Sequence, residues 1–138
     1  MLLQEKLYKI LQDDAQLTAV SYLGHADLLG HPLVEPYGVF MHGPPEEPDF
    51  PLLAYYSSGQ VDVLPRSIYY NFAAWGNNYE AILERVYQLL NNQTALFVDV
   101  TDFHVVRLVW NWAGPEVFDP NYRIYTRTHR YEVQGVKL

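Results

Sequence analysis

The stretch Ser67–Asn91 constrains the fold more than any other part of the chain. It begins with SIYYNFAAW, a run of aromatic and β-compatible side chains that fit a half-buried strand. Gly76 ends this run, and Asn77 and Glu80 then have the spacing of the N-cap and N3 residues of a helix. Apolar residues follow at helical spacing: Tyr79, Ile82, Leu83, Val86 and Leu90. The stretch therefore predicts a strand, a tight turn and an amphipathic helix.

The N-terminal part of the chain predicts two short helices. An apolar stripe predicts a helix over residues 2–13, formed by Leu3, Leu7, Ile10 and Leu11. Carboxylates are unfavourable at the C-terminal end of a helix because of its dipole, so the pair Asp13-Asp14 argues for a break there. We expect Asp14 to cap a second short helix over Ala15–Val20.

Strands are expected on both sides of the central unit. Glycine and proline dominate Ser21–Asp49, in which Tyr37–Met41 predicts a short edge strand. Phe50–Tyr56 predicts a strand that pairs antiparallel with Ser67–Trp75 through a hairpin loop over residues 57–66.

Two more strands are predicted in the C-terminal third. Phe103–Trp112 alternates, and we expect its more apolar face, which carries both Trp110 and Trp112, to meet the helices. Tyr122–Val133 also alternates, but neither of its faces is cleanly apolar. We therefore expect this last strand to be half exposed or to join another chain.

The order of these elements predicts a single α+β domain over residues 1–138. We expect a mainly antiparallel or mixed sheet of four to five strands, with two to three helices packed on one face. A hydrophobic share of 49% and a charged share of 18% supply enough apolar surface for a core. No apolar run approaches the roughly 20 residues of a membrane span, so we expect a soluble protein without a membrane partner.

The charge is unevenly distributed along the chain. Residues 1–62 hold nine acids and two bases (2 − 9 = −7), whereas residues 63–138 hold seven of each (7 − 7 = 0). Proteins that grip nucleic acid nonspecifically draw their affinity from clustered lysine and arginine. The acidic balance argues against such a role, although DNA passing nearby without being gripped remains compatible with it.

The sequence offers little for catalysis. Without cysteine there is no disulfide, thiolate metal site or cysteine nucleophile, and no G-x-S-x-G, P-loop or G-x-G-x-x-G motif occurs. Asp102 and His104 lie two apart on one predicted strand and could project together toward a metal, but no third ligand is evident. Glu46, Glu47 and Asp49 lack the spacing of a calcium loop. We expect no catalytic residue, no metal and no cofactor, and keep a small metal-dependent enzyme as an alternative.

A basic, tyrosine-rich region offers a candidate interface. Its arginines fall on the two C-terminal strands, and aromatic residues lie between them. Such a surface could stack single-stranded nucleic acid, but it could equally receive the acidic GPPEEPD segment (residues 43–49) of an identical subunit arranged head to tail. The candidate interface residues are Glu46, Glu47, Asp49, Arg66, Arg123, Tyr125, Arg127 and Arg130.

Taken in order, these segments resemble the tail terminator (tail-completion) proteins of long-tailed bacteriophages, which also occur in prophages and gene transfer agents. The resemblance rests on the opening LLQEKLYKILQDDAQLTAV, the glycine- and proline-rich segment, and the FPLLAYY strand. It continues through the aromatic strand that ends in Ala-Trp-Gly, the helix NNYEAILERVYQLLN and the final tyrosine-rich strand. The likeness covers nearly the whole chain and is a pattern of elements rather than a single motif.

The resemblance implies a structural virion protein rather than an enzyme. Members of the family form a hexameric ring that caps the finished tail tube and presents a surface to the head. It implies three partners: further copies of the chain, the tail tube protein, and a head-completion or connector protein. DNA would only pass through the ring. The expected location is the tail and neck of the virion, after assembly in the host cytoplasm, and another neck protein is the nearest alternative.

Overall fold

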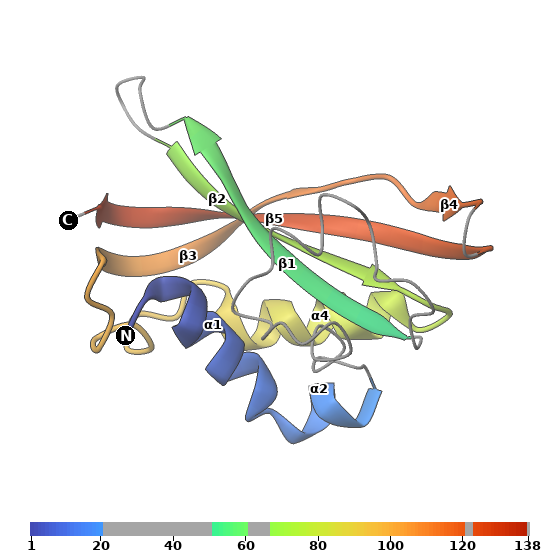
Figure 1. Ribbon diagram of the computed structural model, residues 1–138, viewed down its shortest axis with the longest axis horizontal. Coiled ribbons are helices and arrows are strands. Elements are labelled where there is room, and N and C mark those ends of the chain that lie inside the picture. Colours follow the sequence, from blue (N-terminus) through green and yellow to red (C-terminus); the bar gives the residue numbers. More distant parts are fainter. Residues whose placement is uncertain (21–50, 61–66, 121–122, 138) are drawn as a thin grey trace.

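Three helices lie on one side of an antiparallel sheet in the computed structural model, which describes residues 1–20, 51–60, 67–120 and 123–137 (Figure 1). The helices are α1 (Leu3–Gln12), α2 (Ala15–Val20) and α4 (Tyr79–Leu90). The strands are β1 (Leu52–Gln60), β2 (Ser67–Trp75), β3 (Phe103–Ala113), β4 (Val117–Asp119) and β5 (Ile124–Lys137). The predicted α+β class, with helices on one face of a sheet of four to five strands, is confirmed for the described residues.

The last strand is the centre of the sheet. The strand order is β1-β2-β5-β3, every pair is antiparallel, and β4 pairs with the beginning of β5. The expectation that this strand is half exposed is confirmed for residues 124–130, which are all partly or largely exposed, and its contact with another chain stays a prediction. Its helix-side residues Tyr131 and Val133 are buried, and Arg130 on the opposite face donates to the Asn71 side chain of β2. The predicted hairpin of the first two strands is confirmed, although β1 continues to Gln60 where a loop was expected.

The predicted break between the first two helices is confirmed. Asp14 lies between α1 and α2, and its Oδ2 accepts a hydrogen bond from the backbone N–H of Leu17 at 3.0 Å. The Arg85 guanidinium on α4 donates to both carboxylate oxygens, from Nε at 2.9 Å and from Nη2 at 2.6 Å. Hydrogen bonding to Arg85 lowers the pKa of Asp14. One carboxylate thus caps α2 and ties it to α4.

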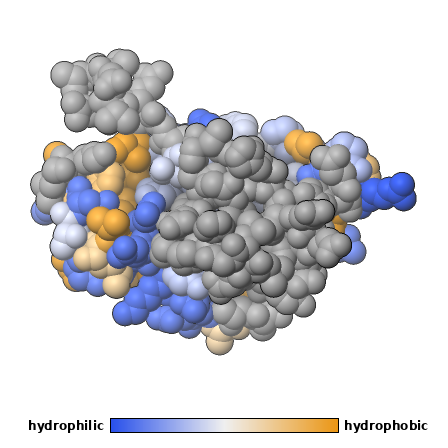
Figure 2. All heavy atoms as spheres, in the orientation of Figure 1, coloured by the Kyte–Doolittle hydropathy of each residue, from blue (hydrophilic) through white to orange (hydrophobic). Residues whose placement is uncertain are grey.

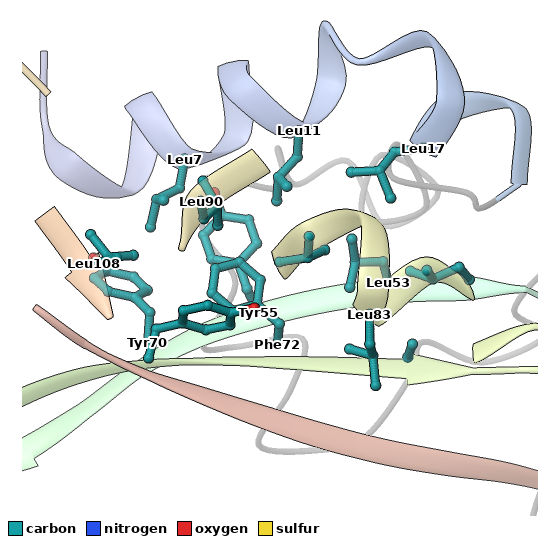
Figure 3. Packing of buried hydrophobic residues seen from close by; sticks show 14 of the residues in the cluster. Leu7, Leu11, Leu17, Leu53, Tyr55, Tyr70, Phe72, Leu83, Leu90 and Leu108 are labelled. Atoms are coloured by element: carbon teal, nitrogen blue, oxygen red, sulfur yellow. The ribbon is translucent and has the colours of Figure 1, made fainter. Parts of the chain in front are cut away.

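The core fills the space between the helices and one face of the sheet (Figure 3). Phe72 on β2 is fully buried, and its ring lies 5.7 Å from Tyr55 on β1 and 5.4 Å from Tyr131 on β5. Leucines at the expected helical positions cover these rings from above: Leu3, Leu7, Leu11, Leu83 and Leu90. Because the aromatic residues come from three adjacent strands, their packing joins the sheet into one core.

The central strand, turn and helix are formed as the sequence predicts, with one difference at the cap. Gly76 makes the turn with a φ of +129°, and its carbonyl accepts a hydrogen bond from the Tyr79 N–H at 3.2 Å. Asn78 is the N-cap residue, and its side chain makes no capping hydrogen bond. The expected capping box of Asn77 and Glu80 is therefore not formed, because the helix begins one residue later.

The end of α4 protects the outer edge of β3. Asn92, with a φ of +59°, donates its N–H to the Leu108 carbonyl at 2.8 Å. The Asn91 side-chain oxygen accepts a hydrogen bond from the Trp110 N–H, also at 2.8 Å. Backbone groups of an edge strand are thereby paired within the chain.

None of the helices in the described ranges is long and apolar enough to span a membrane.

Removing the hydroxyl group should change the free energy of unfolding differently at two buried tyrosines of the core. The Tyr55 hydroxyl donates to the Gln4 carbonyl at 2.6 Å, whereas the Tyr131 hydroxyl is buried and has no hydrogen-bond partner among the described residues. Tyr55→Phe should lower the free energy of unfolding by about 1 kcal/mol, because the Gln4 carbonyl loses its partner. Tyr131→Phe should leave that free energy unchanged or raise it. Urea denaturation of both variants measures the difference, and equal losses would contradict the assignment.

Candidate protein-interaction site

The predicted interface residues that the structure describes do not all lie on one face of the sheet. Glu46, Glu47, Asp49 and Arg66 lie outside the described residues. Arg127 pairs with Ala74 of the core face, whereas Arg130 pairs with Asn71 on the opposite face. Side chains alternate along a strand, so Tyr125 and Arg127 point to the helix side and Arg130 points away from it. The structure brings Tyr125 and Arg127 together and separates them from Arg130.

A β-bulge in β3 places Trp110 and Trp112 on opposite faces of the sheet. Trp110 pairs with Tyr131, but Trp112 pairs with Arg130, so the register shifts by one residue at Asn111. The extra residue moves Trp112 to the opposite face of the sheet. The prediction that both tryptophans share the helix-side face is therefore wrong.

The helix-side face contains a cavity of about 470 Å³ between α4, β3 and β5, which we term the α4–β5 pocket. It is lined by Glu80, Leu83, Glu84, Tyr87, Trp110, Arg127 and His129. The Trp110 and His129 rings pack edge to face with their centroids 6.2 Å apart. The pocket thus has an apolar, largely aromatic floor, with two carboxylates along its helical wall.

Hydrogen bonds fix one lining residue of the pocket, Arg127, and the beginning of α4 beside it. Arg127 Nε donates to the Gly114 carbonyl at 2.7 Å, which fixes the guanidinium against the β3–β4 connection. The Tyr79 hydroxyl donates to the Glu116 carboxylate, and this hydrogen bond raises the pKa of Tyr79 to about 12. Burial lowers the pKa of His129, so this imidazole is neutral near pH 7. The His129 Nδ1 is buried and has no hydrogen-bond partner within the described part of the chain.

Next to the pocket, β4 and the beginning of β5 form a hairpin with exposed aromatic side chains. Phe118 and Tyr125 pair across the two strands, with ring centroids 5.1 Å apart and planes inclined by 63°. Each is 48% exposed, and Val117 is 50% exposed. Arg123 precedes β5, is exposed and has a φ of +53°. Figure 2 shows apolar (orange) and hydrophilic (blue) atoms side by side at the end of the molecule that carries β4.

The opposite face of the sheet carries a second aromatic cluster around Arg130. Its guanidinium carbon lies 5.3 Å from the Tyr69 ring centroid and 5.2 Å from the Trp112 ring centroid. Its Nε donates to the side-chain oxygen of Asn71 at 3.2 Å. The two rings and the amide fix the guanidinium plane, as in other cation–π arrangements. Trp112 is itself 44% exposed, so this cluster is accessible from solvent.

Asp102 and His104 do not form a metal site with a third ligand in the described ranges. Asp102 Oδ1 accepts a hydrogen bond from the Leu3 N–H at 2.9 Å, so its carboxylate serves the N-terminus of α1. His104 is exposed on β3. No group of three histidine or acidic residues lies close enough to hold a metal among the residues that the structure describes.

No local pattern in the sequence predicts the α4–β5 pocket. Glu80 and Glu84 appear only as the polar side of an amphipathic helix, since periodicity does not reveal which strand lies beside them. Their approach to Trp110 and Arg127 depends on pairing between β3 and β5 and on the bulge at Asn111.

Comparison with protein-family models, curated proteins and solved structures finds no match to this chain.

Proposed function

We propose that this chain is a structural protein of a bacteriophage tail, a tail terminator that assembles as a ring on the end of the tail tube. In this proposal, one face of a hexameric ring contacts the last layer of tail tube protein. The other face stops further growth and joins a head-completion or connector protein, while DNA passes through the centre. The resemblance in the order of the sequence segments supports the proposal.

One observation favours a protein that works through contacts with other proteins: exposed aromatic side chains gather on adjacent elements. On the helix side these are Tyr87, Trp110, Phe118 and Tyr125, each between 41% and 48% exposed. Monomeric proteins rarely expose contiguous apolar surface of this kind, and aromatic residues are enriched at protein interfaces. We infer that this surface is covered when the protein is in its working assembly.

The alternative of a small metal-dependent enzyme, which would use Asp102 and His104, has less support. Its candidate ligand Asp102 already accepts a hydrogen bond from the backbone of α1, and a metal would compete with that contact. Another neck protein would use similar surfaces, and the identity of the bound partner separates that alternative from a tail terminator.

The proposal is tested by measuring mass and tube binding together. Native mass spectrometry of the protein, alone and with tail tube protein from the same phage, should give a six-copy mass, and the protein should sediment with assembled tubes. Phe118→Ser combined with Tyr125→Ser should abolish tube binding or ring formation. Val98→Ser is the matched control, because Val98 is 86% exposed and is no part of the aromatic surface. A strictly monomeric protein that also fails to bind tube ends would contradict the proposal.

A further inference from the structure

We propose that the α4–β5 pocket binds the β4–β5 hairpin of a second copy of this chain. The proposal rests on the proposed function, because it names the contact that would join neighbouring subunits of the ring. Three features support it: the chemistry of the pocket, the chemistry of the hairpin, and the fact that different residues form the two surfaces.

The pocket is suited to an apolar group that carries a positive charge. Leu83, Tyr87 and Trp110 supply apolar surface for a partner side chain. Glu80 and Glu84 lie one helical turn apart on α4, both are exposed, and neither forms an ion pair within the described part of the chain. Arg127, the cation among the lining residues, is held by the Gly114 carbonyl. The two carboxylates therefore remain available to a cation from outside.

The hairpin presents the complementary groups. Phe118 and Tyr125 offer a packed aromatic pair on one face of the hairpin, and each side chain is 48% exposed. Arg123 adds a guanidinium to the same end of the hairpin and forms no hydrogen bond or ion pair with described residues. Aromatic side chains with a flanking arginine are the groups that most often dominate binding energy at protein interfaces. Placed in the pocket of a neighbour, they would meet an apolar floor and two carboxylates.

The hairpin and the pocket are neighbouring but different surfaces of one subunit. Figure 1 shows that β4 and the beginning of β5 extend past the end of α4, beyond the part of the sheet that the helices cover. The pocket lies instead along α4 itself. When a projecting element and its complementary pocket are different surfaces, the contact is heterologous and repeats head to tail, closing into a ring when the rotation allows. This geometry favours a second copy as the occupant.

Charge reversal with rescue tests the contact. Arg123→Glu should weaken self-association about tenfold or more, and so should Glu80→Lys combined with Glu84→Lys. The variant with all three changes should recover most of the lost affinity, because the charges are exchanged rather than removed. Analytical ultracentrifugation gives the association constants. Lys9→Glu is the control charge reversal, since Lys9 is exposed on α1 outside both surfaces. All of these side chains are exposed, so the variants should stay folded. Reversing Glu80 in the first turn of α4, or Lys9 in the last turn of α1, should lower the melting temperature only slightly, through the helix dipole.

Mixing two impaired copies tests the head-to-tail arrangement. The hairpin variant Arg123→Glu with Phe118→Ser keeps its pocket, and the pocket variant Glu80→Lys with Glu84→Lys keeps its hairpin. Each alone should be monomeric, whereas an equal mixture should form a two-copy complex and nothing larger, because one intact contact remains.

Three results would overturn the inference: a parent protein that stays monomeric, variants that associate like the parent, or a mixture without complex. If one of these results occurs and the protein still binds tube ends, the contact between pocket and hairpin is refuted, whereas the proposed function is not.

Discussion

Replacing Phe72 by alanine is expected to lower the free energy of unfolding by about 3–5 kcal/mol, the range for deleting a fully buried aromatic ring. Phe72 has no exposed surface, and its ring contacts aromatic rings on both neighbouring strands, at 5.7 Å from Tyr55 and 5.4 Å from Tyr131. Alanine would remove both contacts and leave a cavity below α4. Since natural domains are stabilised by only about 5–15 kcal/mol, the loss would be a large part of the total.

Urea denaturation, followed by tryptophan fluorescence, measures this loss. Phe72→Leu, which keeps much of the volume, should lose clearly less, and Val98→Ala should change stability by less than about 0.5 kcal/mol because Val98 is exposed. A loss below about 1 kcal/mol for Phe72→Ala would contradict the central position of this ring in the core.

Replacing Gly76 by alanine should be the most damaging small substitution in the turn between β2 and α4. Gly76 has a φ of +129°, which side-chain-bearing residues rarely adopt, and such backbone strain costs about 1–3 kcal/mol. A Cβ would also lie 2.9 Å from the Cβ of Pro51 and 3.1 Å from its Cα. The turn cannot shift freely, because the Gly76 N–H donates to the Tyr125 carbonyl at 3.1 Å.

Thermal denaturation of Gly76→Ala and Asn77→Ala compares neighbouring positions of the same turn. Asn77 is exposed, so its substitution should change the melting temperature little. Equal effects at the two positions would show that neither the φ of Gly76 nor its approach to Pro51 limits the sequence here.

Much of the fold follows from local sequence signals. The helical stripe of Leu3, Leu7 and Leu11 predicts the buried side of α1, and the carboxylate of Asp14 marks the break before α2. The aromatic run before Gly76 predicts β2. In each case the signal lies within a few residues of the structure that it determines, so neighbouring residues carry enough information.

The position of β5 could not be predicted in this way. Arg127 and Arg130 leave neither face of the strand cleanly apolar, so the sequence does not place it in the sheet, yet it lies between β2 and β3. The structure accommodates these charges individually: Arg127 bonds to the Gly114 carbonyl, and Arg130 lies between two aromatic rings and bonds to Asn71. Such partners come from distant segments, which periodicity does not identify.

The composition of the candidate site also depends on pairing between distant strands, which the sequence does not reveal. One inserted residue at Asn111 places Trp110 in the α4–β5 pocket and Trp112 beside Arg130. A β-bulge leaves no reliable trace in the alternation of a single strand. The sequence therefore predicts candidate interface residues on β5 but not their division between two faces.

Growth of tail tubes in the presence of the protein tests the proposed function most directly. Tail tube protein from the same phage is allowed to polymerise with increasing amounts of this protein, and electron microscopy measures tube lengths and tube ends. The proposal predicts that tubes stop elongating as the protein is added, with a ring at one end. Tubes that reach the same lengths with bare ends, at every concentration of the protein, would contradict it.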